Sequence, residues 1–184
     1  MTSGVGHRVC VYCASSSYDP ELLAIADAVG AAIARRGWTL VSGGGNVSMM
    51  GAVAEAARRG GARTVGVIPE GLRVREVADT AADELVVVTT MRERKREMEE
   101  RSDAFLTLPG GIGTLEEMFE AWTAASLGFH HKPVVLYDPI GFFRPLLDWV
   151  DSMTESGLVK PHARDALVVC DDLEAALDAC GGRL

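Results

Sequence analysis

The chain alternates between short apolar runs and longer segments in which apolar residues recur at helical spacing. The apolar runs, each of strand length, are Val9–Tyr12, Thr39–Val41, Thr64–Ile68, Leu85–Val88, Phe105–Leu108, Val134–Tyr137 and Leu167–Val169. The helical periods begin with Leu22, Ile25, Ala26, Val29 and Ile33 and continue over residues 50–59, 91–101, 115–127 and 142–154. This alternation predicts an α/β fold with a parallel sheet of about seven strands.

A parallel sheet of this kind predicts a doubly wound, Rossmann-like arrangement with helices on both faces. A last helix is expected over residues 171–180, with Asp171 or Asp172 as its N-cap. Ligands of such folds bind outside the carboxyl ends of the strands, near the point where the strand order reverses. The loops that follow the strands are therefore where we expect a functional site.

A length of 184 residues suits one domain with a three-layer core and is short for two. The sequence contains no internal repeat, linker or low-complexity segment. We therefore predict a single nucleotide-binding-like domain over residues 1–184, with a disordered tail over residues 1–7.

The net charge of −8 argues against a general affinity for the backbones of nucleic acids, but it leaves room for a local site that binds a small anion. The start of the chain has no apolar run with a basic lead, and no stretch of about eighteen apolar residues occurs. We expect a cytoplasmic protein that binds neither nucleic acid nor membrane.

Four cysteines are present, and Cys10 and Cys13 have the spacing of a CxxC motif. Both lie in the first predicted strand, where side chains three residues apart point to opposite faces. No second CxxC follows, so the sequence does not predict a zinc ribbon. We expect four reduced cysteines that pack as small apolar side chains.

The most informative segment is Pro109–Glu117, a glycine-rich turn that follows a predicted strand and opens a helix. Unpaired amides at a helix N-terminus bind anions, and glycine lets the backbone approach the ligand. Two more loops of small residues, Ala14–Ser17 and Ser42–Asn46, follow the first and second strands. Gly43–Gly45 fits neither the dinucleotide nor the P-loop pattern, and a tight turn explains it as well. Together, however, the three loops predict one mononucleotide pocket.

The charged segment over residues 91–101 has the composition of a solvated helix. At about 100° per residue, however, Lys95 lies on the same face as two methionines, with Arg94 on its flank. Arg94 and Lys95 are therefore candidates for holding a phosphate or orienting a carboxylate. Structural cations that extend their charged ends to solvent are the alternative.

Glu117 is a candidate catalytic carboxylate because it follows the glycine turn within the first turns of the helix. Two other roles remain open. Thr114-x-x-Glu117 also fits a capping box, in which the glutamate accepts from the amide of the cap residue. Glu117 points away from the apolar stripe of its helix, so plain exposure to solvent is the other alternative.

These residues resemble the LOG ("lonely guy") family of cytokinin riboside 5'-monophosphate phosphoribohydrolases, many formerly labelled lysine decarboxylases. Pro109–Glu117 is similar to the family signature P-G-G-x-G-T-x-x-E, and Met91–Lys95 is similar to M-x-E-R-K. Gly43–Gly45 with Met50-Gly51 resembles G-G-G…M-G, and Leu127–Pro133 resembles L-G-x-H-x-K-P. The correspondence extends from about Val9 to Cys180, and several spaced motifs in order are more specific than one glycine loop.

The resemblance implies hydrolysis of the N-glycosidic bond of an N6-substituted adenosine 5'-monophosphate, which gives a free cytokinin base and ribose 5-phosphate. It implies a homodimer that needs no metal or cofactor, with Arg94 and Glu117 as the catalytic pair. The expected substrate contacts are Ser15, Gly44, Gly45, Met50, Glu76, Lys95, Gly110, Gly111, Ile112, Gly113, Thr114, Leu115, Glu116 and Thr123.

Two departures concern the substrate. The family usually has Gly-Ser-Ser where this chain has Ala14-Ser15-Ser16, and Ile-Pro-Lys where it has Ile68-Pro69-Glu70. The reversed charge at Glu70 bears on substrate preference, and the sequence does not identify the N6 substituent.

Three other activities differ in how well the residues fit them. A pyridoxal-dependent decarboxylase needs a Schiff-base lysine, and the chain offers only Lys95, Lys132 and Lys160 on a small domain. A broader hydrolase that accepts AMP and a nucleotide carrier without turnover remain open. For the dimer, the segment Met118–Phe129 supplies apolar residues that pack either in the core or against a partner.

Overall fold

The computed structural model describes residues 6–73 and 77–182. Seven strands form one sheet: β1 (Arg8–Tyr12), β2 (Thr39–Ser42), β3 (Thr64–Pro69), β4 (Glu84–Val88), β5 (Ala104–Thr107), β6 (Val134–Tyr137) and β7 (Leu167–Cys170). Their order is β4-β3-β2-β1-β5-β6-β7, and every neighbouring pair is parallel. The predicted parallel α/β fold is confirmed, and the single sheet supports the proposal of one domain.

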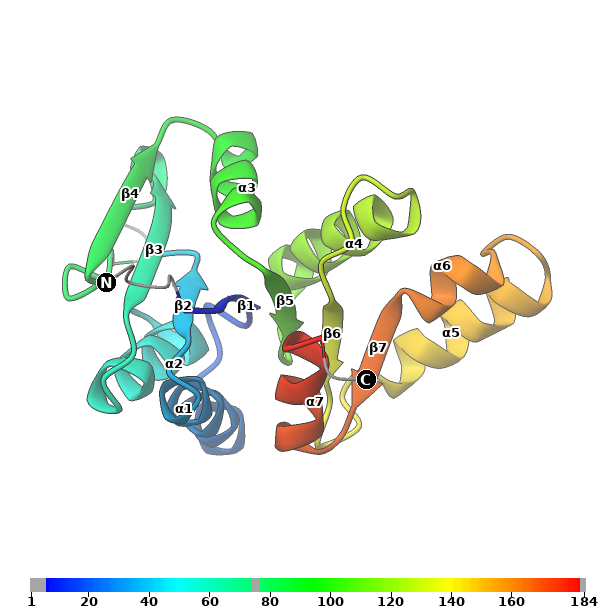
Figure 1. Ribbon diagram of the computed structural model, residues 1–184, viewed down its shortest axis with the longest axis horizontal. Coiled ribbons are helices and arrows are strands. Elements are labelled where there is room, and N and C mark those ends of the chain that lie inside the picture. Colours follow the sequence, from blue (N-terminus) through cyan, green and yellow to red (C-terminus); the bar gives the residue numbers. More distant parts are fainter. Residues whose placement is uncertain (1–5, 74–76, 183–184) are drawn as a thin grey trace.

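Helices cover both faces of the sheet (Figure 1). The helices are α1 (Pro20–Arg35), α2 (Ser48–Arg59), α3 (Met91–Glu100), α4 (Ile112–Ser126), α5 (Arg144–Glu155), α6 (Pro161–Asp165) and α7 (Leu173–Cys180), with a short 3-10 turn, η1, at Glu70–Leu72. Helices α1, α2 and α7 pack on one face, and α3, α4 and α5 pack on the other.

The strand order reverses beside β1, in the middle of the sheet. The chain builds outward from β1 to β4, and α3 then returns it to β5 on the other side of β1. The loops after β1 and β5 therefore leave the sheet side by side, and the Ala14 amide donates to the Pro109 carbonyl at 3.2 Å. This is the switch point at which parallel sheets bind ligands.

The first strand shows how the core divides. Val9 and Val11 belong to the apolar cluster under α1 and α2, whereas Cys10 and Tyr12 belong to the cluster under α3 and α4. Cys13 continues the first set, so the two cysteines of the CxxC spacing do lie on opposite faces. All four cysteines are free thiols, and burial raises the pKa of Cys180 to about 12.

Several boundaries differ from the sequence prediction. Helix α4 begins at Ile112, three residues before the predicted start, and α2 begins at Ser48. Helix α6 and the η1 turn were not predicted, whereas Asp172 caps α7 as expected by accepting from the Ala175 amide at 2.9 Å.

The expected tail over residues 1–7 lies partly outside the described residues. His7 belongs to the folded structure, because its ring lies 4.5 Å from that of Trp38 and its carbonyl accepts from the Thr39 amide. Over the described residues, no helix is long and apolar enough to span a membrane.

Candidate active site

The N-terminus of α4 presents its first amides without a side-chain cap. The N-cap residue is Gly111, and no side chain of the cap closes the helix end. A Cβ on Gly111 or on Gly113 would meet no atom within 4 Å, whereas a Cβ on Gly110 would lie 2.2 Å from the Thr114 hydroxyl. Gly110 is therefore needed for packing, and the other two glycines keep the helix end accessible to an anion.

Because α4 starts at Ile112, Thr114 lies within its first turn and is not its cap. The capping-box alternative for Glu117 is therefore wrong. Glu117 is not simply solvated either, because only 13% of its side chain is exposed and one of its oxygens lies 3.9 Å from Nη1 of Arg94. The carboxylate thus projects from an early turn of α4 and lies beside a buried cation.

Arg94 is 5% exposed, and two backbone carbonyls hold its guanidinium. Its Nε donates to the Val67 carbonyl at 3.1 Å, and its Nη2 donates to the Gly43 carbonyl at 2.8 Å. These bonds use two edges of the planar group and direct Nη1 toward Glu117. The helical phase predicted a cation on this side of α3, and the structure buries the charged group itself.

The Gly43–Gly45 loop packs against the guanidinium of Arg94. A Cβ on Gly43 would lie 2.1 Å from Nη2 of Arg94, so no other residue fits without moving the guanidinium. Gly44 has a φ of +74° and packs against the backbone of Val67, which explains why this position also favours glycine. The glycines thus allow the loop to pack closely against the Arg94 guanidinium, a role that the sequence did not predict.

A cavity of about 320 Å³ opens between these elements. Nine of the predicted site residues line it: Ser15, Met50, Arg94, Gly111, Ile112, Gly113, Thr114, Glu116 and Glu117. Six others do not: Gly44, Gly45, Lys95, Gly110, Leu115 and Thr123. Glu76 lies outside the described residues.

Four residues of the cavity wall were not predicted: Cys13, Ser16, Leu72 and Met91. Cys13 and Ser16 follow β1, so their position at the end of a parallel strand was the available signal. Burial, and next the charge of Glu117, raises the pKa of the Cys13 thiol. Cys13 therefore lines the cavity as a neutral thiol and does not act as a nucleophile.

Lys95 connects two helices instead of facing the cavity. Its ammonium forms ion pairs with Glu116 and Glu120 of α4. Burial works to lower the pKa of Lys95, but the two carboxylates outweigh it, so the pKa is raised. The lysine therefore stays charged and ties α3, which carries Arg94, to α4, which carries Glu117.

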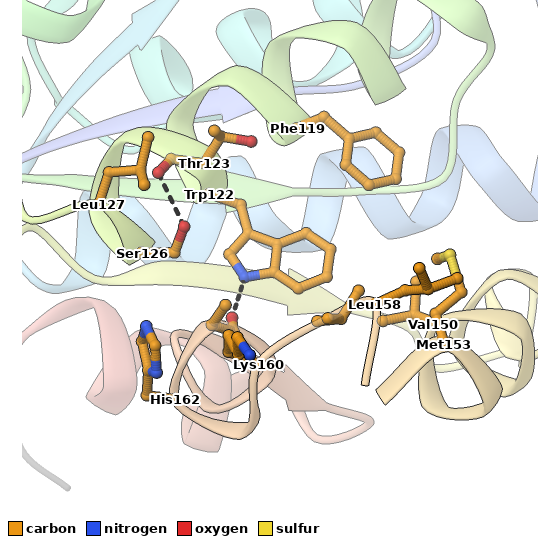
Figure 2. A pocket seen from close by; sticks show the side chains of 12 residues that line it. Phe119, Trp122, Thr123, Ser126, Leu127, Val150, Met153, Leu158, Lys160 and His162 are labelled. Atoms are coloured by element: carbon orange, nitrogen blue, oxygen red, sulfur yellow. Dashed lines mark hydrogen bonds between the residues drawn. The ribbon is translucent and has the colours of Figure 1, made fainter. Parts of the chain in front are cut away.

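A second hollow, also of about 320 Å³, lies between α4, α5 and α6 (Figure 2). Its wall is mostly apolar, and Nε1 of Trp122 donates to the Ala163 carbonyl. Thr123 lines this hollow, so within one chain it is separated from the first cavity. Leu127 and Leu158 leave much of their side chains exposed at its edge.

None of the three lysines lines the first cavity. Lys132 donates to the Glu99 carbonyl and lies over the ring of Phe105, and Lys160 lines the second hollow. Across residues 6–73 and 77–182, no three His, Cys, Asp or Glu side chains are grouped to hold a metal ion.

Comparisons with known proteins identify the family of this chain. Residues 50–180 match a family described as "Possible lysine decarboxylase". A cytokinin riboside 5'-monophosphate phosphoribohydrolase of Mycobacterium tuberculosis is 58% identical over 94% of this chain and 92% of its own length. A phosphoribohydrolase of the same name from Arabidopsis thaliana is 42% identical over 88% of this chain and 75% of its own. The chain belongs to the family of these phosphoribohydrolases.

Solved structures of low sequence identity share the fold of this chain. A molybdenum cofactor binding protein from Rippkaea orientalis superposes with a TM-score of 0.73 at 23% identity, covering 98% of both chains. A molybdenum cofactor carrier protein from Chlamydomonas reinhardtii gives 0.71 at 24% identity, over 98% of both chains. At these identities the likeness concerns the fold alone.

Proposed function

We propose that this protein hydrolyses the N-glycosidic bond of cytokinin riboside 5'-monophosphates and releases the free base and ribose 5-phosphate. The observation that carries the proposal is the pairing of Arg94 and Glu117 beside the open N-terminus of α4, in a chain 58% identical to a phosphoribohydrolase. The site thus offers an anion-binding end and a carboxylate about one helical turn apart.

The 5'-phosphate would bind the amides from Gly111 to Thr114. The missing Cβ atoms at Gly111 and Gly113 leave room for its oxygens, and the helix dipole favours its negative charge. Such anchoring fixes the position of the sugar, and binding energy from the phosphate then lowers the barrier at the glycosidic bond. A riboside without phosphate would lose this contribution.

The reaction breaks the bond between C1' of the ribose and a ring nitrogen of the base. The bonding electrons leave with the base, and positive charge develops on C1' and the ring oxygen. Glu117 would stabilise this charge and take a proton from the water whose oxygen bonds to C1'. The proton that Glu117 takes from the water would pass to the departing nitrogen, so the free base leaves neutral and the carboxylate is restored.

Arg94 would act on the carboxylate and on the charge of the substrate. Its Nη1 faces Glu117 while the other edges of the guanidinium are bound to carbonyls, so the cation has a fixed orientation. A fixed positive charge holds the Glu117 carboxylate in place, and preorganised charges cost no reorganisation during the reaction. Met50, Leu72 and Met91 supply an apolar wall suited to the base.

The test is chromatography of products after the pure protein is incubated with N6-isopentenyl-AMP, AMP and N6-isopentenyladenosine in parallel. Release of isopentenyladenine from the monophosphate, slowed at least about a hundredfold in Glu117→Gln, is the expected result. Comparable cleavage of AMP would indicate a broader nucleotide hydrolase. Binding without release from any substrate would contradict the proposal and favour a carrier.

We also propose a homodimer, as family resemblance implies. The face formed by α4 and its following loop carries large exposed apolar side chains, with Phe129 at 80% exposure near Leu127. Contiguous apolar surface of this kind commonly marks an interface. Because Thr123 lines the hollow on this face, a substrate contact from Thr123 would require the partner chain.

A further inference from the structure

An ion pair outside the cavity joins the end of α2 to the loop before β4. Nη1 of Arg58 donates to Oδ2 of Asp79 at 2.6 Å, and Asp79 is only 2% exposed. Oδ1 of Asp79 accepts from the Ala81 amide at 3.2 Å, so both carboxylate oxygens are used. A carboxylate this deeply buried is costly unless it is paired, which makes the ion pair a fixed point of this region.

The backbone around Asp79 holds the triple-glycine loop. The Asp79 amide donates to the Gly44 carbonyl at 2.9 Å, and the Asn46 amide donates to the Val77 carbonyl at 2.8 Å. Between these bonds, Gly45 pairs with Ala78 in an isolated antiparallel bridge. Residues 77–79 therefore bind the loop from Gly44 to Asn46.

On its opposite side, the loop packs tightly against β3. A Cβ on Gly66 would lie 2.8 Å from the Cα of Gly44, so the loop backbone lies directly on β3. The loop is thus held between β3 and residues 77–79, and its Gly43 carbonyl binds Nη2 of Arg94. A shift of this carbonyl would turn the guanidinium relative to Glu117.

We propose that Arg58 and Asp79 are positioning residues for the reaction: their buried ion pair fixes the Gly43–Gly45 loop and thereby the orientation of Arg94 toward Glu117. This inference rests on the proposed function, in which Arg94 and Glu117 act together. Neither Arg58 nor Asp79 lines the cavity, so they act only through the loop. Misplacement of a catalytic group by about 1 Å is enough to slow turnover markedly.

The test compares Asp79→Asn with Asp27→Asn. Asparagine keeps the size of Asp79 and an acceptor for Ala81 but removes the charge that Arg58 meets. Asp27 pairs at 2.6 Å with Arg59, the next residue of the same helix end, without contacting the glycine loop. We expect kcat on N6-isopentenyl-AMP to fall at least about tenfold in Asp79→Asn with KM within about twofold, and Asp27→Asn to match the wild type.

Two further measurements separate positioning from general destabilisation. In an Arg94→Ala background, Asp79→Asn should lower kcat by less than about twofold more, because the group it positions is gone. The Nε–H resonance of Arg94, which reports its bond to Val67, should shift in Asp79→Asn and stay unchanged in Asp27→Asn. If Asp79→Asn folds poorly, Arg58→Ala takes its place, because it removes a partly exposed side chain. It should show the same fall in kcat and the same shift of the Arg94 resonance.

Wild-type kcat in both Asp79→Asn and Arg58→Ala, or a full additional loss in the Arg94→Ala background, would overturn the inference. These outcomes differ from a failure of the proposed function. If the proposed function is wrong, the wild-type protein itself releases no base. In that case the Arg94 resonance still decides whether the ion pair orients the guanidinium.

Discussion

At the scale of single residues, Arg94 combines a buried charge with bonds that only a guanidinium can make. Lysine in its place would keep the charge but could not bind the Val67 and Gly43 carbonyls and still face Glu117. We expect Arg94→Lys to lower kcat at least about a hundredfold, as lost electrostatic preorganisation does. Arg92→Lys, on the exposed face of the same helix, should leave steady-state kinetics unchanged.

A substitution at Gly43 tests most directly whether the packing of the glycine loop fixes Arg94. Gly43→Ala places a methyl group 2.1 Å from Nη2, so either the loop or the guanidinium must move. We expect kcat to fall at least about tenfold and the free energy of unfolding to drop by about 1–3 kcal/mol, as overpacking does.

The control is Gly71→Ala, because a Cβ there meets no atom within 4 Å. Its unfolding free energy in urea and its kcat should stay near those of the wild type. An active, fully stable Gly43→Ala protein would show that the arginine does not depend on this glycine.

Residue roles were predictable from the sequence where they follow from helical phase. Phase predicted that Arg94 lies beside the inward face of α3, and burial of its guanidinium agrees. Phase also placed Lys95 on the face of the two methionines, but it could not reveal that Glu116 and Glu120 lie opposite. That pairing depends on how two helices meet on one face of the sheet, which spacing along one helix does not encode.

At the scale of elements, the chain contains the Thr-x-x-Glu pattern twice, and only one copy caps a helix. At the start of α3, the Thr90 hydroxyl accepts from the Glu93 amide, and the Glu93 carboxylate accepts from the Thr89 and Thr90 amides. At Thr114–Glu117 the helix has already begun at Ile112. Local sequence alone does not separate the two copies, because the glycines before α4 leave its start undefined.

The cap at α3 leads to a prediction on pH. The amides of Thr89 and Thr90 lower the pKa of Glu93 in the folded protein. A lowered carboxyl pKa adds stability above the unfolded pKa of about 4.3, and this stability is lost as the pH falls through the folded value. Glu93→Ala should therefore have a lower melting temperature than the wild type at pH 7, and the gap should narrow below about pH 4.

Glu100→Ala is the matched control, because Glu100 lies on the same helix and only approaches Arg96 at 4.0 Å on the exposed surface. Its melting temperature should stay close to that of the wild type at both pH values. A gap for Glu93→Ala that persists unchanged at pH 3 would mean that the carboxylate does not stabilise α3 through its charge.

Element types were predicted more accurately than element ends. All seven apolar runs became strands, because burial on both faces leaves a strong apolar signal. Helix α6 was missed because five residues are too few for an apolar period, and only Pro161 at its first turn marked it.

At the scale of the whole molecule, strand order decides which loops meet. The glycine turn before α4 lies beside the loop after β1 because β5 pairs with β1, although some 90 residues separate them. The doubly wound pattern predicted a shared edge for these loops. It could not predict that residues 77–79 bind the triple glycine, since the pairing of Gly45 with Ala78 is a local contact between loops.

The proposed homodimer gives the last prediction. Leu127 and Phe129 follow α4 and expose their side chains to solvent, at a cost that a partner surface would remove. A stable interface buries roughly 800 Å² per partner, so an aspartate at its centre should prevent association. Light scattering after size exclusion should give twice the 19.6 kDa chain mass for the wild type and one chain mass for Phe129→Asp.

Ile140→Asp serves as the control, because Ile140 is also an exposed apolar residue but lies in the turn after β6. It should remain dimeric. If Thr123 contacts substrate across the interface, Phe129→Asp should also raise KM for the monophosphate, because a monomer keeps Arg94 and Glu117 but lacks the contact from its partner. A wild-type protein that runs as a monomer at all concentrations would refute the dimer and leave Thr123 as a surface residue of the hollow.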